Sequence, residues 1–179
     1  LIPYITSYYK RNWGFCLSEQ ERNQLKSGLY RVYIDSKHYP GELHIADAIL
    51  AGKEDSEILF TSYVCHPSMA NNELTGPVLV CALLDYVKNK YLRRKWSYRF
   101  ILQPETIGSI AYLSRHHERM KEKTLMGFNI SCAGDEGPFS YISSPNESTL
   151  ADHAITAAIG KEKEIKAYSF LKRGSDERQ

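Results

Sequence analysis

Three side chains with metal-binding or acid–base chemistry follow apolar segments of the sequence: His66, Glu105 and Asp135. They lie 39 and 30 residues apart, a spacing that fits one strand and one helix between each pair. Because the carboxyl ends of parallel strands meet at one edge of a sheet, we expect the three side chains to converge there. Imidazole and carboxylate groups are ligands of Zn²⁺, and a spare carboxylate could act as general base towards water. The spacing therefore predicts a site for a divalent metal ion.

A short polar loop adds further oxygen ligands beside the histidine. Pro67 cannot donate the next hydrogen bond of a strand, so the strand before it should end at His66. Asn71, Asn72 and Glu73 follow before the next helix begins. Their side-chain oxygens extend the set of hard-to-borderline ligands around His66.

The segments that position these residues alternate between strand and helix. The apolar run at 57–64 is typical of a strand buried on both faces. A helix is predicted over 75–90, with a buried face made by Val78, Leu79, Ala82, Leu83, Tyr86 and Val87. Further strands are predicted at 97–103, 125–132, 139–143 and 165–171, and further helices at 108–119 and 149–160. We expect an α/β fold in three layers, with a mostly parallel sheet and helices on both of its faces.

The first 56 residues have a different pattern. Ser18 and Glu21 have the spacing of a capping box, which predicts a short helix from Glu19 onward. Alternating apolar residues before and after the turn at 39–41 predict an antiparallel hairpin. We therefore expect three parts. They are an aromatic segment with a short helix at 1–28, a β hairpin at 29–56 belonging to an inserted β subdomain, and an α/β domain at 57–179. We also expect the chain to be a fragment that lacks the C-terminal part of this domain.

Charge and composition exclude several classes of protein. Lys and Arg number 23 and Asp and Glu 21, a net charge of +2, so there is no basic footprint of a nucleic-acid-binding protein. No apolar stretch approaches the roughly 20 residues needed to cross a membrane, and no signal peptide is visible. Cys65, Cys81 and Cys132 lie in apolar patterns, which predicts buried, reduced thiols in a cytoplasmic protein. The sequence does not indicate an oligomeric state.

Several longer motifs resemble a known family. They are CHPSMANNELTGP at 65–77, PETIGSIAYLS at 104–114, the Gly134-Asp135-x-Gly137 turn and RGSDERQ at 173–179. The order of a strand ending in His, a polar loop opening a helix, a strand ending in Glu and a turn with Gly-Asp resembles the zinc exopeptidase superfamily. That superfamily holds zinc aminopeptidases and glutaminyl cyclases. More narrowly, the motifs are similar to a bacterial aminopeptidase-like family of unknown function, which carries an inserted β domain and a winged-helix end.

The resemblance implies a role for each matching residue. His66 and Asp135 would bind the first metal ion, and Asn72 stands where the family has an aspartate that bridges two metals. Glu105 matches a region with two adjacent glutamates, one a ligand and one the general base, and here it could take either role. The Asn72 amide cannot offset the repulsion between two divalent ions, so the chain is expected to hold one ion or none rather than two. The side chain of Glu73 is expected to point away from this position.

The resemblance also implies a substrate site. Asp176 and Glu177 are similar to a segment of the pocket wall, where Asp176 would bind the amine of the substrate or take part in a proton relay. A histidine for the second metal is expected beyond residue 179. Zinc is the implied cofactor, as one or two ions in the superfamily, with Asn72 arguing against the second ion here.

Together these residues predict an aminopeptidase-like metallohydrolase that cleaves a peptide or small amide with a free amine, using metal-activated water. Two alternatives remain open. One is a non-catalytic binding module on the same fold that lost its metals through Asn72. The other is an amide-forming or cyclising enzyme, since one fold can host several chemistries.

Overall fold

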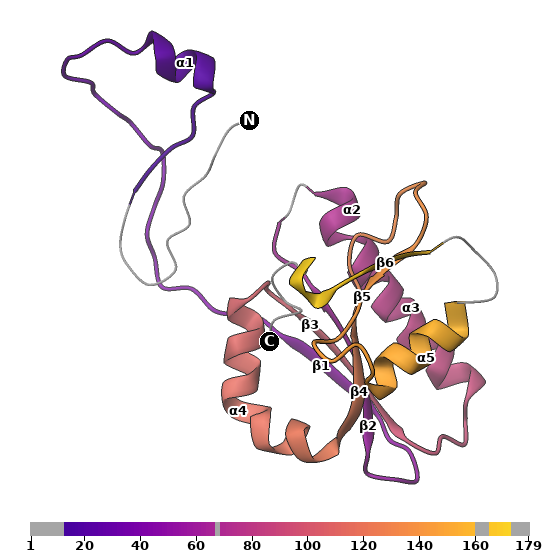
Figure 1. Ribbon diagram of the computed structural model, residues 1–179. Coiled ribbons are helices and arrows are strands. Elements are labelled where there is room, and N and C mark those ends of the chain that lie inside the picture. The colour runs from indigo at the N-terminus through magenta and orange to yellow at the C-terminus, as the bar shows by residue number, and fades with distance from the viewer. Residues whose placement is uncertain (1–12, 67–68, 160–164, 173–179) are drawn as a thin grey trace. The chain divides into compact units, whose positions relative to one another are not determined.

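A four-stranded mixed sheet organises residues 41–179 (Figure 1). The computed structural model describes residues 13–66, 69–159 and 165–172. The sheet has the strand order β1-β3-β2-β4, in which β2 is parallel to β3 and β4 while β1 runs antiparallel to β3. The strands are β1 Ala46–Leu50, β2 Glu57–Tyr63, β3 Ser97–Gln103 and β4 Thr124–Asn129.

The helices of this unit are α2 Ala70–Glu73, α3 Thr75–Lys90, α4 Ile107–Lys123 and α5 Leu150–Ile159. A parallel pair, β5 Ser140–Ile142 and β6 Lys166–Tyr168, and a 3-10 helix at Phe170–Lys172 complete it. The predicted α/β class, with a mostly parallel sheet, is confirmed.

Residues 1–40 form a separate unit, of which α1 (Glu19–Gln24) is the one described helix. The predicted capping box is present. The Ser18 hydroxyl accepts a hydrogen bond from the Glu21 backbone N–H at 3.2 Å, and the Ser18 N–H donates to Oε2 of Glu21 at 2.9 Å. Two backbone donors at the start of α1 are thereby satisfied.

The predicted hairpin of residues 29–56 is wrong. Within the described part of the chain, residues 25–45 contain no strand, and β1 pairs with β3 instead, from Ala46 opposite Leu102 to Leu50 opposite Tyr98. An isolated two-stranded hairpin is marginally stable in water. By pairing with β3, β1 instead forms its backbone hydrogen bonds within a packed sheet. The alternation of apolar residues in 29–36 therefore did not specify a strand partner.

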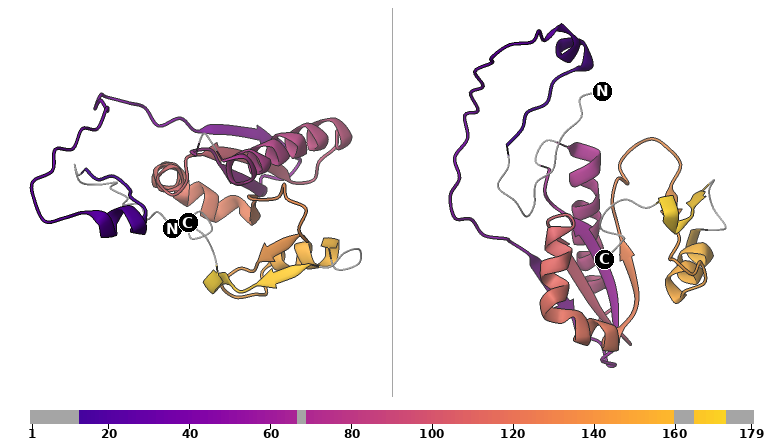
Figure 2. Two further views of the ribbon diagram at one scale, coloured as in Figure 1. Left: turned by 90° about the horizontal axis from the view of Figure 1, so that it is seen from above. Right: turned by 60° about the vertical axis from the view of Figure 1, so that its left-hand side comes forward.

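Helices α3 and α4 cover opposite faces of the sheet (Figure 2). On one face Phe100 of β3 packs with Val80 and Val87 of α3 in the buried core. On the other, the neighbouring residues of β3 contact α4. Gln103 Nε2 donates to the Ser109 hydroxyl at 2.7 Å. Side chains alternate along a strand, so successive residues of β3 face α3 on one side and α4 on the other. β3 is therefore covered on both faces and lies in the middle layer of three.

The buried face of α3 agrees with the predicted one at Leu83 and Val87 and differs from it at other positions. Val80 is 1% exposed, whereas Val78 is 63% and Tyr86 53% exposed. The predicted buried thiols are also wrong, because Cys65, Cys81 and Cys132 are exposed and free. Among the described residues no helix is both long and apolar enough to cross a membrane.

The first turn of α3 lies directly against the sheet at Gly76. A Cβ added there would overlap the Ser62 hydroxyl and the carbonyl oxygen of Ile130. We expect Gly76→Ala to lower the free energy of unfolding by about 1–3 kcal/mol, because the helix must shift away from β2. Urea denaturation followed by circular dichroism measures this. Gly41→Ala is the matched control, since its Cβ would meet nothing within 4 Å. Equal stability of the two variants would show that the close packing at Gly76 is not required.

Candidate metal centre

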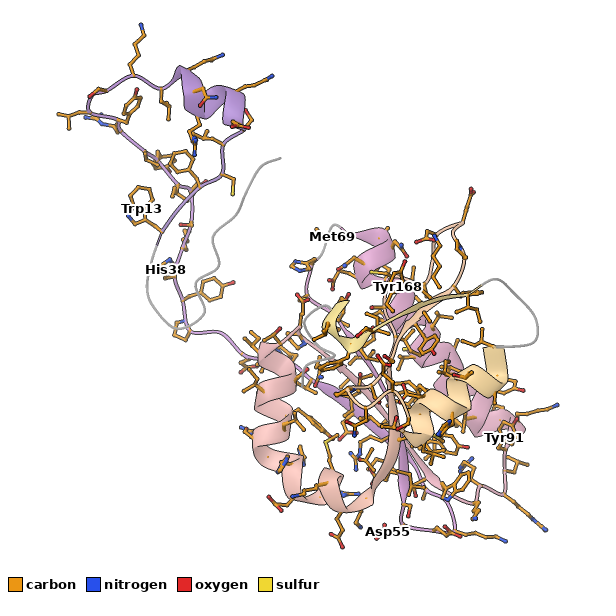
Figure 3. All side chains as sticks on the ribbon, in the orientation of Figure 1. Trp13, His38, Asp55, Met69, Tyr91 and Tyr168 are labelled. Atoms are coloured by element: carbon orange, nitrogen blue, oxygen red, sulfur yellow. The ribbon has the colours of Figure 1, made fainter. Side chains whose placement is uncertain are left out.

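The carboxyl ends of β2, β3 and β4 lie at one edge of the sheet because these strands are parallel. Figure 3 labels Met69, the residue before α2, near this edge, and Asp55, before β2, at the opposite one. The Val64 N–H still donates to the carbonyl of Gln103, at 2.8 Å. The chain therefore leaves the sheet only after Val64, and Cys65 and His66 lie at the edge where α/β proteins bind their ligands.

Two carboxylates approach the His66 imidazole at this edge. Nε2 of His66 lies 3.5 Å from Oε2 of Glu105 and 4.0 Å from Oε1 of Glu73. The Glu73 side chain is 4% exposed and that of Glu105 28%, while His66 is half exposed. The structure thus brings together two of the predicted residues, His66 and Glu105, although they are far apart in the sequence.

The structure adds Glu73, which sequence reasoning had directed elsewhere. Its Oε2 accepts a hydrogen bond from the Cys65 backbone N–H at 2.7 Å, so the carboxylate is turned back towards the end of β2. Ligand atoms of Cys65, His66 and Glu73 lie within 4.8 Å of one another. Cys65 as a whole is exposed, but partial desolvation of its thiol raises the thiol pKa, and the negative charges of Glu73 and Glu105 raise it further. The sequence feature that could have indicated this role is the carboxylate of Glu73 directly after the neutral Asn72.

Asn72 contacts a different pair of groups. Its Nδ2 lies 3.5 Å from the Tyr63 hydroxyl and 3.5 Å from Sγ of Cys132. Burial raises the pKa of Tyr63 well above its usual range, so its phenol is neutral near pH 7. Asn72, the predicted bridging residue, is itself neutral, and its amide nitrogen is directed towards the neutral Tyr63 phenol and Sγ of Cys132.

Asp135 is held by the loop rather than by the histidine. Its Oδ2 accepts from Asn71 Nδ2 at 3.1 Å and its Oδ1 from the Gly137 N–H at 2.8 Å. Of the described residues, those with a carboxylate oxygen within 4.0 Å of His66 are Glu73 and Glu105, and Asp135 is not among them. β4 ends at Asn129, earlier than the predicted residue 132, so five residues separate Asp135 from the sheet. Its role as a ligand stays a prediction.

The predicted substrate-binding residues, Asp176 and Glu177, lie outside the described residues.

Two unusual backbone conformations flank the candidate site within the described chain. Thr106, which follows Glu105, has φ 58°, and Cys132, beside Asn72, has φ 49°. Positive φ is uncommon for a β-branched residue and is concentrated at functional sites.

The donor set suits a zinc-like ion. One imidazole and two carboxylates are ligands that Zn²⁺ accepts. Ligand atoms about 2.0–2.1 Å from a tetrahedral ion lie roughly 3.4 Å apart, close to the 3.5 Å and 4.0 Å separations around His66 Nε2. The two separations that involve His66 are therefore compatible with a single divalent cation.

Comparison with known proteins identifies the family. Residues 16–179 match the family described as "Domain of unknown function (DUF4910)". The chain belongs to this family. A relative from Clostridium acetobutylicum, named "Putative polysaccharide biosynthesis protein with aminopeptidase-like domain", is 39% identical over 183 aligned residues. The alignment covers 99% of this chain and 41% of the relative, so the chain spans about two fifths of the relative's length.

Two solved structures share the fold of this DUF4910 chain. A "putative peptidase" from Clostridium acetobutylicum superposes with a TM-score of 0.80 at 38% identity, over 99% of this chain and 42% of that one. A glutaminyl cyclase from an Acidobacteriales bacterium superposes with a TM-score of 0.60 at 13% identity, over 75% of this chain and 53% of that one. At that identity the cyclase shows the fold alone. The predicted membership of an aminopeptidase-like family of unknown function is confirmed.

Proposed function

We propose that this protein is an aminopeptidase-like metallohydrolase that cleaves a peptide or small amide with a free amine. One observation carries the proposal. The His66 imidazole nitrogen lies 3.5 Å and 4.0 Å from the carboxylates of Glu105 and Glu73, at the carboxyl edge of a parallel sheet. One relative is named as having an "aminopeptidase-like domain" and a solved structure as a "putative peptidase", which supports amide hydrolysis as the reaction class.

Each residue has a stated role in this proposal. A divalent ion held at His66 would polarise the scissile carbonyl and lower the pKa of water to about 7. Glu105, the more accessible of the two carboxylates, would help hold the ion or accept a proton from water at Oε2. Asp135 is kept as a predicted ligand, and Asp176 with Glu177 as predicted partners of the substrate amine.

The test combines metal analysis and hydrolysis with the full-length protein. We expect bound zinc, hydrolysis of aminoacyl 4-nitroanilides, loss of hydrolysis on treatment with EDTA, and recovery with Zn²⁺ or Mn²⁺. A zinc-free protein that stays inactive with added metal would contradict the proposal. A glutaminyl peptide serves as a second substrate, because a cyclising enzyme would release ammonia from it without consuming water.

The non-catalytic alternative makes a different prediction for one variant. If Asn72 has abolished metal binding, the wild-type protein binds no ion and Asn72→Asp gains one in a Zn²⁺ titration. If our proposal is correct, the wild-type protein already binds the ion.

We also propose a cytoplasmic location, because the four cysteines are free and exposed, as is usual in a reducing compartment.

A further inference from the structure

We propose that Glu73, rather than Asn72, supplies the buried carboxylate ligand, so that the chain holds a single divalent cation among His66, Glu73 and Glu105. This inference rests on the metal dependence proposed above. It concerns which residues bind the ion and how many ions are bound, and its test does not depend on the substrate.

The burial of Glu73 is the first observation. The side chain is 4% exposed, and a buried carboxylate is costly unless it is hydrogen-bonded, paired or bound to a metal. Oε2 is satisfied by the Cys65 N–H at 2.7 Å. In the described part of the chain, the neighbours of Oε1 are the Cys65 thiol at 3.9 Å and the His66 imidazole at 4.0 Å. Neither distance is that of a strong hydrogen bond, so Oε1 has only weak partners and is available to bind a cation.

The backbone hydrogen bond from Cys65 gives Glu73 a fixed direction. It connects residues eight positions apart, across the loop between β2 and α2. With Oε2 anchored, Oε1 faces His66, and the ligand atoms are positioned before an ion arrives. Such a hydrogen bond to one oxygen orients the carboxylate for coordination by the other.

The position of Asn72 is the second observation. Its Nδ2 is directed towards the Tyr63 hydroxyl and Cys132 Sγ, each at 3.5 Å. A neutral amide also cannot offset the repulsion between two divalent ions a few Å apart. The carboxylate at Glu73 lies on the His66 side, where it can serve one ion. These contacts point to a mononuclear centre.

The test is Zn²⁺ titration by calorimetry into EDTA-stripped full-length protein, with the thermal midpoint as a second readout. We expect one Zn²⁺ per chain and a higher midpoint when zinc is bound. Glu73→Gln keeps the shape and the acceptor for the Cys65 N–H but loses the charge, so it should lower the affinity by about a hundredfold or more. Asn72→Ala is the matched control at the adjacent position and should stay within about threefold of the wild type.

Each outcome decides the inference. If Asn72→Ala weakens binding as much as Glu73→Gln, or if the wild-type protein binds two ions, the inference is overturned while the proposed function stands. If the wild-type protein binds no ion, both fail. Should Glu73→Gln not fold, Glu73→Asp retains the charge on a shorter side chain. Its zinc affinity should then fall by about tenfold, and wild-type affinity in that variant would contradict a ligand role.

Discussion

Replacing His66 with alanine should abolish tight metal binding, lowering the affinity for Zn²⁺ by about a thousandfold or more and removing hydrolysis. His66 is the residue towards which both carboxylates converge, at 3.5 Å and 4.0 Å. Without the imidazole the remaining oxygens cannot form the set of ligands that selects a zinc-like ion. The measurements are the zinc content after dialysis and the rate of aminoacyl 4-nitroanilide hydrolysis.

A second histidine provides the control for this variant. His117 lies on α4, is 60% exposed and contacts Glu118. His117→Ala should leave both zinc content and hydrolysis unchanged. Because His66 is half exposed, its removal should change the free energy of unfolding by less than about 1 kcal/mol. Zinc content that is unchanged in His66→Ala would place the metal elsewhere in the protein.

The largest effect on stability is expected at Arg99, in the middle of β3. Its Nε donates to Oε2 of Glu57 at 2.6 Å and its Nη1 to Asp47 at 2.7 Å and to the Tyr112 hydroxyl at 2.9 Å. Arg99 and Glu57 are 3% and 2% exposed. Arg99→Met would leave a buried carboxylate without its main partner, which costs about 3–5 kcal/mol in the free energy of unfolding. Urea denaturation measures this cost.

Arg119 is the matched control because it contacts the same carboxylate from the surface. Its Nη2 lies 3.0 Å from Oε1 of Glu57 and its side chain is 49% exposed. Arg119→Met should cost less than about 1 kcal/mol. Removing both charges in Glu57→Leu/Arg99→Met should recover much of the loss. A similar cost for Arg99→Met and Arg119→Met would show that burial does not determine the strength of these pairs.

The pH dependence of stability gives an independent check on the same pair. Burial alone would raise the pKa of Glu57, but the hydrogen bonds and charges of Arg99 and Arg119 outweigh burial and hold the pKa below its ordinary value. The ionised carboxylate therefore stabilises the fold above the unfolded-state pKa of about 4.3, and this contribution is lost as the pH falls through the lower folded-state pKa. In Arg99→Met the Glu57 carboxylate keeps only Arg119 as a charged partner, so its pKa should be higher than in the wild type. The stability difference between wild type and variant should thus narrow in acid.

Much of the candidate site could be predicted from the sequence, because its signals are local. Pro67 after an apolar run placed His66 at a strand end, and the motif around Glu105 placed a carboxylate at the next one. Parallel pairing of β2 with β3 then brings these two ends together. Asp135 was harder to place, because β4 ends at Asn129 and the hydrogen bond from Asn71 directs the loop that follows.

The choice between Glu73 and Asn72 could not be made from the sequence. Adjacent residues in a four-residue helix point in different directions, and the backbone turn at Cys65 selects which one faces His66. The sequence also did not reveal the role of Arg99, a charged residue within a mostly apolar strand. Its buried ion pairs with Glu57 and Asp47 are formed only in the tertiary structure.

What the sequence alone determined was the order of the main strands and helices from residue 57 onward, the capping box of α1, the extent of β3 and α3, and the family. These depend on short-range periodicity, caps and motifs, which act between neighbouring residues. The tertiary structure decided the partner of β1, the buried face of α3 and the carboxylates that approach His66. Val78 and Val80 both belong to apolar patterns with helical spacing, and only packing against Phe100 buries one of them. Contacts between residues distant in the chain settle such choices, and no local pattern encodes them.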